Sequence, residues 1–364
     1  MSLTPVDAVD LLRQLDDYDT IIDARSEDEY ALDHLPGAVN WPTLDNAQRH
    51  TVGTVYKQVN PFEARKMGAA MAARNIADHI QQRALDKPRS WRPLVYCWRG
   101  GQRSGSLALI LGQIGFRVSI IEGGYKAFRF AIVADTERLA PLFDYRVVCG
   151  TTGSGKTRLL HALGRAGAQV LDLEDLANHR SSVLGAIPGL AQPSQKAFDT
   201  LVWDRLRRFD PARPVFVESE SRKVGNVTVP VAVMDAMRSS GNCLNLELSD
   251  PERVALLMED YAYFVRNTDA FCARLDALTE IRGKQVVQGW KTSVQSGAIE
   301  SVVQELLIQH YDPVYLQSMQ RNFKRYAQAR TLSPEDRSSS AMDALAVGLV
   351  NQVTPTLHHP TRPG

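Results

Sequence analysis

The chain has 364 residues, a length that suits about two domains. Hydrophobic residues make up 44% of it and charged residues 23%, an ordinary composition for a globular protein with a sizeable core. Lys and Arg number 42 and Asp and Glu 41, so the net charge of +1 excludes a chain-wide basic field for nucleic acid, and any RNA site must be a local patch.

The N-terminal segment and the cysteines indicate the cellular compartment in which the protein is expected. Residues 1–19 are too acidic and too weakly apolar for a signal peptide, and no run approaches the roughly 18 apolar residues that a membrane span needs. The four cysteines are scattered and show neither a C-x-x-C pair nor the spacing of zinc ligands. These features predict a soluble protein of the reducing cytoplasm with no membrane partner, and they assign no metal ligands.

Residues 5–133 are predicted to form a first α/β domain. The expected elements are a helix over 7–15, a strand over 20–24, a helix over 62–86, a strand over 94–96, a helix over 104–112 and a strand over 117–121. Strands that alternate with helices predict a parallel sheet.

A cysteine ends the strand over 94–96 and is followed by a loop rich in glycine and arginine. Cys97 precedes Trp-Arg-Gly-Gly-Gln-Arg-Ser and then a helix. Backbone N–H groups of such a loop, the helix N-terminus and the charges of Arg99 and Arg103 all stabilise a thiolate, the reactive form of cysteine. A buried structural cysteine is the alternative, but two glycines and two arginines within six positions favour a catalytic Cys97 assisted by Arg99 and Arg103.

This segment resembles rhodanese-like domains. The residues that carry the resemblance, besides Cys97, Arg103 and Ser104, are Asp23, Arg25, Glu29, the run 34–40 and Glu122-Gly123-Gly124. The usual sulfurtransferase loop has its arginine five positions after the cysteine, whereas Arg103 follows Cys97 by six, a C-x5-R spacing that resembles the phosphatase branch of the superfamily. The longer loop suits a tetrahedral ligand such as selenophosphate, and it leaves a phosphatase-like activity open.

Residues 134–144 are predicted to be a helical linker and residues 145–350 a second α/β domain. Its strand candidates are 145–149, 169–173, 214–217 and 243–248. From Asp250 to about Leu349 the chain reads mostly helical, and residues 354–364 are predicted to be a disordered tail.

A phosphate-binding loop follows the strand over 145–149. It consists of Gly150, Thr151, Thr152, Gly153, Ser154, Gly155, Lys156 and Thr157. This run matches G-x-x-x-x-G-K-[ST] at every fixed position, between a strand and a helix, so we expect its N–H groups and Lys156 to hold phosphate oxygens. Thr157 would contact Mg²⁺ where that ion is bound, and the motif does not distinguish a nucleotide from a diphosphate ester. The fold class is therefore α/β: a rhodanese-like domain, then a P-loop domain with a doubly wound parallel sheet and a helical C-terminal part.

Acidic and basic side chains after two further strands are candidates for supporting roles. Glu218 and Glu220 follow one strand and Asp172 and Glu174 another, the positions expected for carboxylates near a metal, although solvated strand-end acids fit equally well. Arg222 is a candidate anion clamp or a surface residue.

The stretch Arg321–Arg330 mixes basic and aromatic residues, which suits RNA. Leu316, Met319, Phe323 and Tyr326 recur at helical spacing, however, so the aromatic residues are predicted to face the core and the cations the solvent. For an apolar substrate cleft the sequence offers only residues near the cysteine loop, namely Met67, Met71, Trp91 and Trp98.

The two domains in this order resemble the family of tRNA 2-selenouridine synthases, also described as tRNA 2-thiouridine geranyltransferases and selenotransferases. The stretches that carry the resemblance are 52–58, 97–104, 122–127, 150–157, 172–174, 179–180, 220–222 with Gly225, and 311–313. It extends over about residues 20–315.

The resemblance implies a transferase that acts on wobble uridine 34 of the tRNAs for Lys, Glu and Gln. It implies that geranyl diphosphate alkylates the sulfur of 2-thiouridine and that selenium from selenophosphate then replaces the geranylthio group. In this scheme Cys97 is the nucleophile that handles selenium, and residues 150–157 hold a diphosphate or selenophosphate. Both compounds are co-substrates, and no cofactor is required. A nucleotide-dependent persulfide sulfurtransferase and a C-x5-R phosphatase-like protein are the other activities that the residues leave open.

Overall fold

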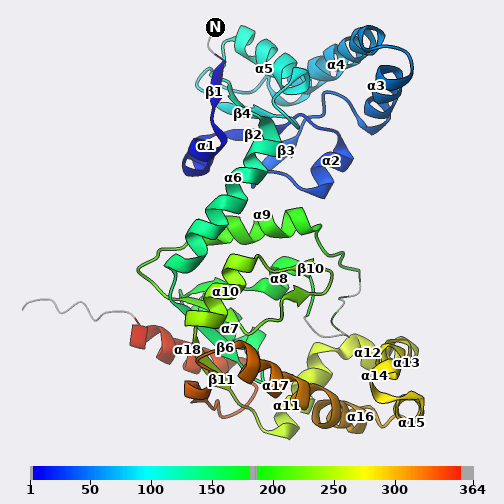
Figure 1. The fold of residues 1–364 in the computed structure, drawn as a ribbon, viewed down its shortest axis with the longest axis vertical. Coiled ribbons are helices and arrows are strands. Elements are labelled where there is room, and N and C mark those ends of the chain that lie inside the picture. The colour runs from blue at the N-terminus through cyan, green and yellow to red at the C-terminus, as the bar shows by residue number, and fades with distance from the viewer. Residues whose placement is uncertain (1–2, 181–184, 186, 188, 354–364) are drawn as a thin grey trace, which may run out of the picture. The chain divides into compact units, whose positions relative to one another are not determined.

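The structure, a computed structural model, describes residues 3–180, 185, 187 and 189–353. The chain divides into two compact units, and each has its own parallel sheet (Figure 1). The first unit comprises Met1–Glu137 and Pro193–Asp204, and the second comprises Arg138–Gln192 and Arg205–Gly364. The predicted disordered tail lies outside the described residues. The predicted linker, residues 134–144, coincides with the end of a helix and the short turn after it.

Five parallel strands form the sheet of the first unit, in the order β1-β5-β4-β2-β3. Their bounds are β1 (Thr4–Val6), β2 (Thr20–Asp23), β3 (Ala38–Asn40), β4 (Pro93–Tyr96) and β5 (Ser119–Ile121). The strands predicted over 20–24, 94–96 and 117–121 are confirmed. The sequence did not reveal β1 and β3, because these two edge strands are short and partly exposed and lack the apolar run of the inner strands.

Helices cover the first sheet. They are α1 (Ala8–Gln14), α2 (Glu27–Leu32), α3 (Asn46–Gln58), α4 (Pro61–Arg83), α5 (Gln102–Ile114), α6 (Gly124–Leu139) and most of α9 (Gln195–Leu206), with the 3-10 turn η1 (Leu15–Asp17). Local signals set their ends: the Asn60 side chain accepts from the N–H groups of Phe62 and Glu63, and Pro61 occupies the first turn of α4. Gly115, at φ 112°, ends α5 in the left-handed conformation.

The core of the first unit packs around β2 and β4. Ile22, Val95 and Leu107 are fully buried beside Trp91, whose ring meets Phe116 edge-on at 5.0 Å. All four residues of β4 are buried, since helices cover both faces of the parallel sheet. This packing fixes the position at which β4 ends and Cys97 begins the loop.

Five parallel strands also form the sheet of the second unit, in the order β12-β11-β6-β8-β7. Their bounds are β6 (Tyr145–Cys149), β7 (Gln169–Leu171), β8 (Val215–Glu218), β11 (Asn242–Leu246) and β12 (Arg330–Leu332); β9 (Lys223–Val224) and β10 (Val227–Thr228) form a separate hairpin. Because β6, β7 and β8 are neighbours and parallel, the residues after their carboxyl ends meet at one edge of the sheet.

The rest of the second unit is mostly helical, as predicted. Its elements are η2 (Ala140–Leu142), α7 (Lys156–Arg165), α8 (Leu173–Ala177), α10 (Val231–Ser240), α11 (Asp250–Asp260), α12 (Ala262–Arg266), α13 (Thr268–Leu275), η3 (Asp276–Leu278), α14 (Thr279–Arg282), α15 (Lys284–Gln295), α16 (Ile299–Leu306), the π-helical turn η4 (Leu307–Tyr311), α17 (Asp312–Asn322), η5 (Tyr326–Gln328) and α18 (Ser339–Val353). None of the described helices has the length and apolar character needed to cross a membrane.

The helical prediction fails around residue 323. Helix α17 ends at Asn322, and the chain then turns through η5 into β12, the edge strand of the sheet. Phe323 is buried as predicted, but Leu316 is 42% exposed. The predicted single apolar stripe is therefore wrong, because the spacing of these residues continues past the point where the helix stops.

Candidate functional site

Cys97 lies at the carboxyl end of β4 with its thiol held by the loop that follows. Its Sγ accepts hydrogen bonds from the Gly101 N–H at 3.2 Å and from the Ser104 Oγ at 3.1 Å. Helix α5 begins at Gln102, so the first turn of a helix lies beside the sulfur. The sulfur therefore lies among hydrogen-bond donors beside a helix N-terminus, the surroundings that the sequence predicted for this loop.

Two glycines let the segment before α6 approach the cysteine loop closely. Gly124 has φ 60°, and a Cβ there would lie 2.3 Å from the Cys97 carbonyl oxygen and 2.5 Å from the Gly100 nitrogen. The N–H groups of Tyr125 and Lys126 donate to the carbonyls of Cys97 and Trp98 at 2.8 and 3.0 Å. The Glu122-Gly123-Gly124 run thus fixes the backbone of the loop rather than supplying reactive groups.

The predicted arginines of the loop differ in their surroundings. Arg103 donates to Glu29 at 2.6 and 3.3 Å, and Arg49 lies 3.0 Å from the same carboxylate. Burial raises the pKa of Glu29, but the bonds from Arg103, the charge of Arg49 and the bond from Ser26 outweigh it and lower that pKa below its usual range. Arg99 is exposed. Arg103 therefore anchors α2 to the loop, and the thiol itself is held by Gly101 and Ser104.

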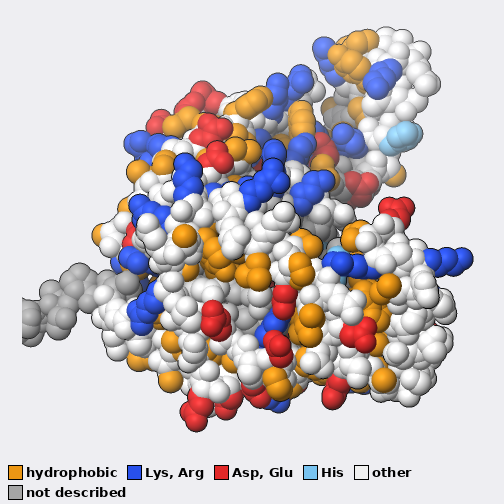
Figure 2. Space-filling model, turned by 60° about the horizontal axis from the view of Figure 1, so that its bottom comes forward, with side chains coloured by type: hydrophobic (Ala, Val, Ile, Leu, Met, Phe, Trp, Pro, Cys, Tyr) orange, Lys and Arg blue, Asp and Glu red, His pale blue; other side chains and the backbone are white. Residues whose placement is uncertain are grey.

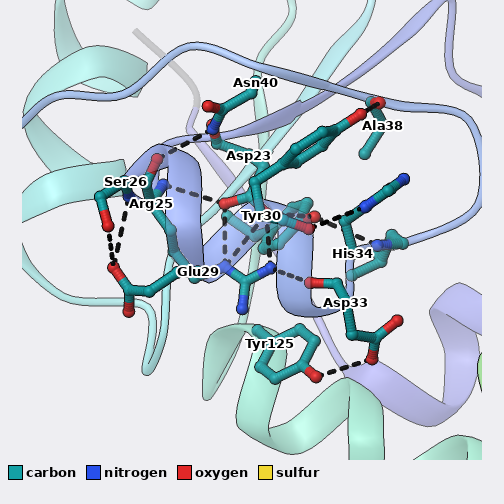
Figure 3. Close-up of polar contacts among 12 residues, drawn as sticks. Asp23, Arg25, Ser26, Glu29, Tyr30, Asp33, His34, Ala38, Asn40 and Tyr125 are labelled. Carbon is teal, nitrogen blue, oxygen red and sulfur yellow. Dashed lines mark hydrogen bonds and ion pairs between the residues drawn. The ribbon is translucent and has the colours of Figure 1, made fainter. Parts of the chain in front are cut away.

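A buried ion pair supports the loop from the neighbouring strand (Figure 3). Asp23 and Arg25 are 0% and 1% exposed and pair at 2.6 Å, with the Tyr96 hydroxyl donating to the same carboxylate at 2.8 Å. Arg25 also donates to the Asp33 carbonyl and lies 3.9 Å from the centre of the Tyr125 ring. The charged groups of Asp23 and Arg25 are thus occupied by each other and by neighbouring groups, and their contacts orient β2, β4 and α6. These two rhodanese-like residues are therefore positioning residues.

The P-loop joins β6 to α7 and depends on its glycines. Gly150 has φ 149°, and a Cβ there would lie 2.4 Å from Ser154 Oγ and 2.5 Å from the Leu246 carbonyl oxygen. Gly153 and Gly155 also have positive φ, at 78° and 89°. Lys156 Nζ donates to the Gly150 carbonyl at 2.8 Å and lies 5.3 Å from the centre of the Tyr315 ring.

Two residues that the sequence did not single out brace this loop. The Tyr315 hydroxyl accepts from the Gly150 N–H at 2.6 Å and lies 2.7 Å from Ser219 Oγ. Arg253 is 5% exposed, donates twice to the Thr152 carbonyl and pairs with Asp312 at 2.5 Å. Asp312 belongs to the stretch 311–313, which resembles the synthase family, and this resemblance was the only indication in the sequence that the region matters. Nothing in the sequence indicated a role for Arg253.

Three carboxylates meet beside the P-loop. Glu174, Glu218 and Glu220 each place an oxygen within 4.8 Å of the others, and Thr157 Oγ1 donates to Glu174 at 3.5 Å. Burial, followed by the charges of Glu174, Glu220 and Asp172, raises the pKa of Glu218 well above its usual range. Its Oε1 is buried and has no hydrogen-bond partner among the described residues. Because Mg²⁺ prefers oxygen ligands, this donor set fits a magnesium ion.

A cavity of about 330 Å³ opens at these groups. Of the predicted residues, Thr152, Gly153, Gly155, Lys156, Thr157, Glu218 and Glu220 line it. Gly150, Thr151, Ser154 and Arg222 are not among the lining residues, and Arg222 is exposed just before the β9–β10 hairpin. Glu174, Arg180 and His310 also line the cavity.

The surface in Figure 2 mixes Lys and Arg side chains with acidic and hydrophobic ones, in keeping with the small net charge. Within Arg321–Arg330, Arg325 donates to Asn242 at 2.8 Å and Arg330 to Gln352 at 2.5 Å. Two cations of this stretch thus bind other residues of the second unit, and RNA contact there stays a prediction.

Comparison with known proteins finds a family for each of the two parts of the chain. The domain family described as "tRNA 2-selenouridine synthase AAA domain" matches residues 143–288, and the rhodanese-like domain family matches residues 7–131. A tRNA 2-selenouridine synthase of Nitrosomonas europaea is 31% identical over 348 residues, with 83% of this chain and 89% of the relative covered. Those of Nitrosomonas eutropha and Cupriavidus necator are both 32% identical, with 83% and 81% of this chain and 88% and 87% of the relatives covered. The chain belongs to the tRNA 2-selenouridine synthase family.

Proposed function

We propose that this protein is a transferase that converts 2-thiouridine at wobble position 34 of the tRNAs for Lys, Glu and Gln into 2-selenouridine. Geranyl diphosphate and selenophosphate are the co-substrates, and no other cofactor is required. The observation that carries the proposal is that one chain of this family has both a P-loop cavity and a hydrogen-bonded thiol. The reaction needs a site that binds the diphosphate leaving group, which the cavity suits, and a nucleophile, which the thiol suits.

The first step is alkylation at sulfur. The 2-thiouridine sulfur attacks C1 of geranyl diphosphate, so a C–S bond forms, the C1–O bond breaks and diphosphate leaves, while the proton on N3 passes to solvent. The P-loop N–H groups and Lys156 supply positive charge where negative charge grows on the leaving oxygen. This step turns the sulfur into a good leaving group.

The second step exchanges sulfur for selenium, and in the route proposed here Cys97 acts on the base carbon rather than on selenium itself. The Cys97 thiolate attacks C2 of the alkylated base, a bond from C2 to Sγ forms, and geranylthiolate leaves and takes up a proton. The selenium of selenophosphate then attacks C2 and restores the Cys97 thiolate. Water cleaves the Se–P bond, which releases phosphate, and N3 regains its proton. The Gly101 N–H and Ser104 hydroxyl stabilise Cys97 whenever it is a thiolate.

Glu174, Glu218 and Glu220, with Thr157, would hold Mg²⁺ against the diphosphate. When bound, the ion supplies positive charge to the phosphate oxygens. The buried, unpartnered oxygen of Glu218 supports this role, because a carboxylate without a hydrogen bond is costly to bury.

Mass spectrometry of nucleosides tests the proposal directly. Purified protein is incubated with 2-thiouridine tRNA and with geranyl diphosphate and selenophosphate, first separately and then together. We expect the geranylated nucleoside with the first co-substrate alone and 2-selenouridine with both. An unchanged nucleoside in every arm would refute the proposal, and ATPase and aryl-phosphatase assays would then decide between the sulfurtransferase and phosphatase-like alternatives.

A further inference from the structure

A second cavity, of about 60 Å³, lies among the helices that follow β11. Its interior is formed by apolar side chains of α11, α12, α13 and α16, including Met258, Phe264, Phe271, Ile299 and Val303. Phe264 and Phe271 stack with their ring centres 5.5 Å apart and are 6% and 4% exposed. The cavity therefore has a rigid apolar wall.

This apolar cavity adjoins the P-loop cavity. Four residues line both, namely Thr152, Leu257, Tyr261 and Tyr311. Thr152 belongs to the phosphate loop itself, so the apolar space begins where the phosphate-binding groups end. A ligand that fills both cavities has an anionic phosphate head and an apolar tail.

We propose that the apolar cavity holds the terminal isoprene unit of a prenyl diphosphate whose head lies on the P-loop, an inference that rests on the function proposed above. A water-sized group needs roughly 10–15 Å³ of such space, so 60 Å³ has room for about four to six heavy atoms. One isoprene unit has five carbons. The unit nearer the phosphate then passes between the shared residues, and the Phe264–Phe271 stack limits the chain to two units.

The lining chemistry separates this occupant from a nucleotide base. A buried base leaves its polar edges unpaired unless donors and acceptors face it, which is costly. The interior named above offers hydrocarbon, aromatic rings and a thioether, which suit a prenyl chain. The sequence-based candidates for an apolar cleft, Met67, Met71, Trp91 and Trp98, belong to the first unit instead.

The test measures binding of geranyl diphosphate, farnesyl diphosphate, dimethylallyl diphosphate and inorganic diphosphate to the full chain by calorimetry, without tRNA. Burying one methylene group raises affinity by about fourfold, so we expect geranyl diphosphate to bind at least about 100-fold more tightly than dimethylallyl diphosphate. Val303→Phe fills the cavity and should remove most of that difference while leaving inorganic diphosphate binding unchanged. Val286→Phe, at an exposed position of α15, is the matched control and should change neither.

Phe271→Ala enlarges the cavity and should raise the affinity for farnesyl diphosphate about tenfold or more relative to geranyl diphosphate. The nucleoside assay with this variant and farnesyl diphosphate should then show the farnesylated nucleoside. Wild-type preference for geranyl diphosphate that survives Val303→Phe would overturn the subsite and leave the proposed function standing. Equal binding of geranyl and inorganic diphosphate, with no alkylated nucleoside, would overturn both. Circular dichroism of each variant verifies folding, and Val303→Phe tests the proposal even where Phe271→Ala does not fold.

Discussion

At the scale of single residues, Lys156 gives the P-loop its one full positive charge. In the structure its ammonium group donates to the Gly150 and Thr151 carbonyls, within the loop that is to receive phosphate. We expect Lys156→Ala to weaken geranyl diphosphate binding by about 1.5–3 kcal/mol, the scale of a hydrogen bond to a charged group. Calorimetry measures this, with Lys223→Ala at the exposed position of the hairpin strand β9 as control. Unchanged affinity for both geranyl diphosphate and selenophosphate would contradict the role.

Cys97 is assigned to the selenium step alone, which makes its prediction specific. Cys97→Ser keeps a group that accepts hydrogen bonds from Gly101 and Ser104 but removes the thiolate. We expect the geranylated nucleoside to accumulate at the wild-type rate while 2-selenouridine falls at least about 100-fold. Cys272→Ala, which removes a buried thiol of the second unit, should retain both products. Wild-type selenation by Cys97→Ser would exclude Cys97 from the chemistry.

Glu29 links α2 to the cysteine loop through charge, so its contribution depends on pH. Its pKa is lowered in the folded state, although burial alone would raise it, so its ionised form stabilises the fold above pH 4.5, and this stability is lost as the pH falls below that value. We expect Glu29→Gln to reduce the free energy of unfolding by about 1–2 kcal/mol at pH 7 and by less below pH 4.5.

Urea denaturation at several pH values measures this difference. Asp28→Asn, an exposed carboxyl of the same helix, should show little change at any pH. A loss for Glu29→Gln that stays constant down to pH 3 would assign the effect to packing rather than to the Arg103 and Arg49 pairs.

At the scale of elements, the turn before α6 tests whether close backbone approach shapes the cysteine loop. Gly124→Ala places a methyl group 2.3 Å from the Cys97 carbonyl oxygen at a positive φ, where a side chain costs roughly 1–2 kcal/mol before any clash. We expect a lower melting temperature and a selenium step reduced more than geranylation. Gly105→Ala, inside α5 with open space around it, should instead stabilise by about 0.5–1 kcal/mol. Equal effects of the two variants would show that the loop tolerates displacement.

The sequence predicted the elements that have long periodic patterns or a chemical motif. Helix α4, the buried strand β4 before Cys97 and the β6–P-loop–α7 unit were identified because their signals are local. The short edge strands β1, β3 and β12 carry three residues each and are defined by their pairing with β5, β2 and β11 rather than by a local pattern. For the same reason the sequence noted Glu218 and Glu220 but could not show that Glu174 joins them, nor that Arg253 and Tyr315 brace the P-loop.

At the scale of the whole molecule, the chain leaves the first unit at Glu137 and returns to it for Pro193–Asp204 before completing the second. In the first unit, Thr200 donates to Asp33 at 3.1 Å, Arg129 pairs with Asp199 at 2.8 Å, and the fully buried Trp203 meets Phe128 edge-on at 5.6 Å. The rhodanese-like match at residues 7–131 therefore omits a helix that the first unit uses.

A fragment of residues 1–137 should consequently be less stable than the same fragment joined by a flexible linker to residues 193–206. Without α9 the side of α6 that carries Phe128 loses its cover, and removing a buried aromatic side chain alone costs about 3–5 kcal/mol. Thermal unfolding compares the two fragments, and a third, in which the joined helix carries Trp203→Ala and Thr200→Ala, is the matched control. We expect the joined helix to raise the melting temperature and the doubly substituted helix to restore little of that gain. If the fragment alone, the fragment joined to α9 and the fragment joined to the substituted α9 all melt at the same temperature, the rhodanese-like domain is complete by itself. Helix α9 would then lie on its surface without contributing to the stability of its core.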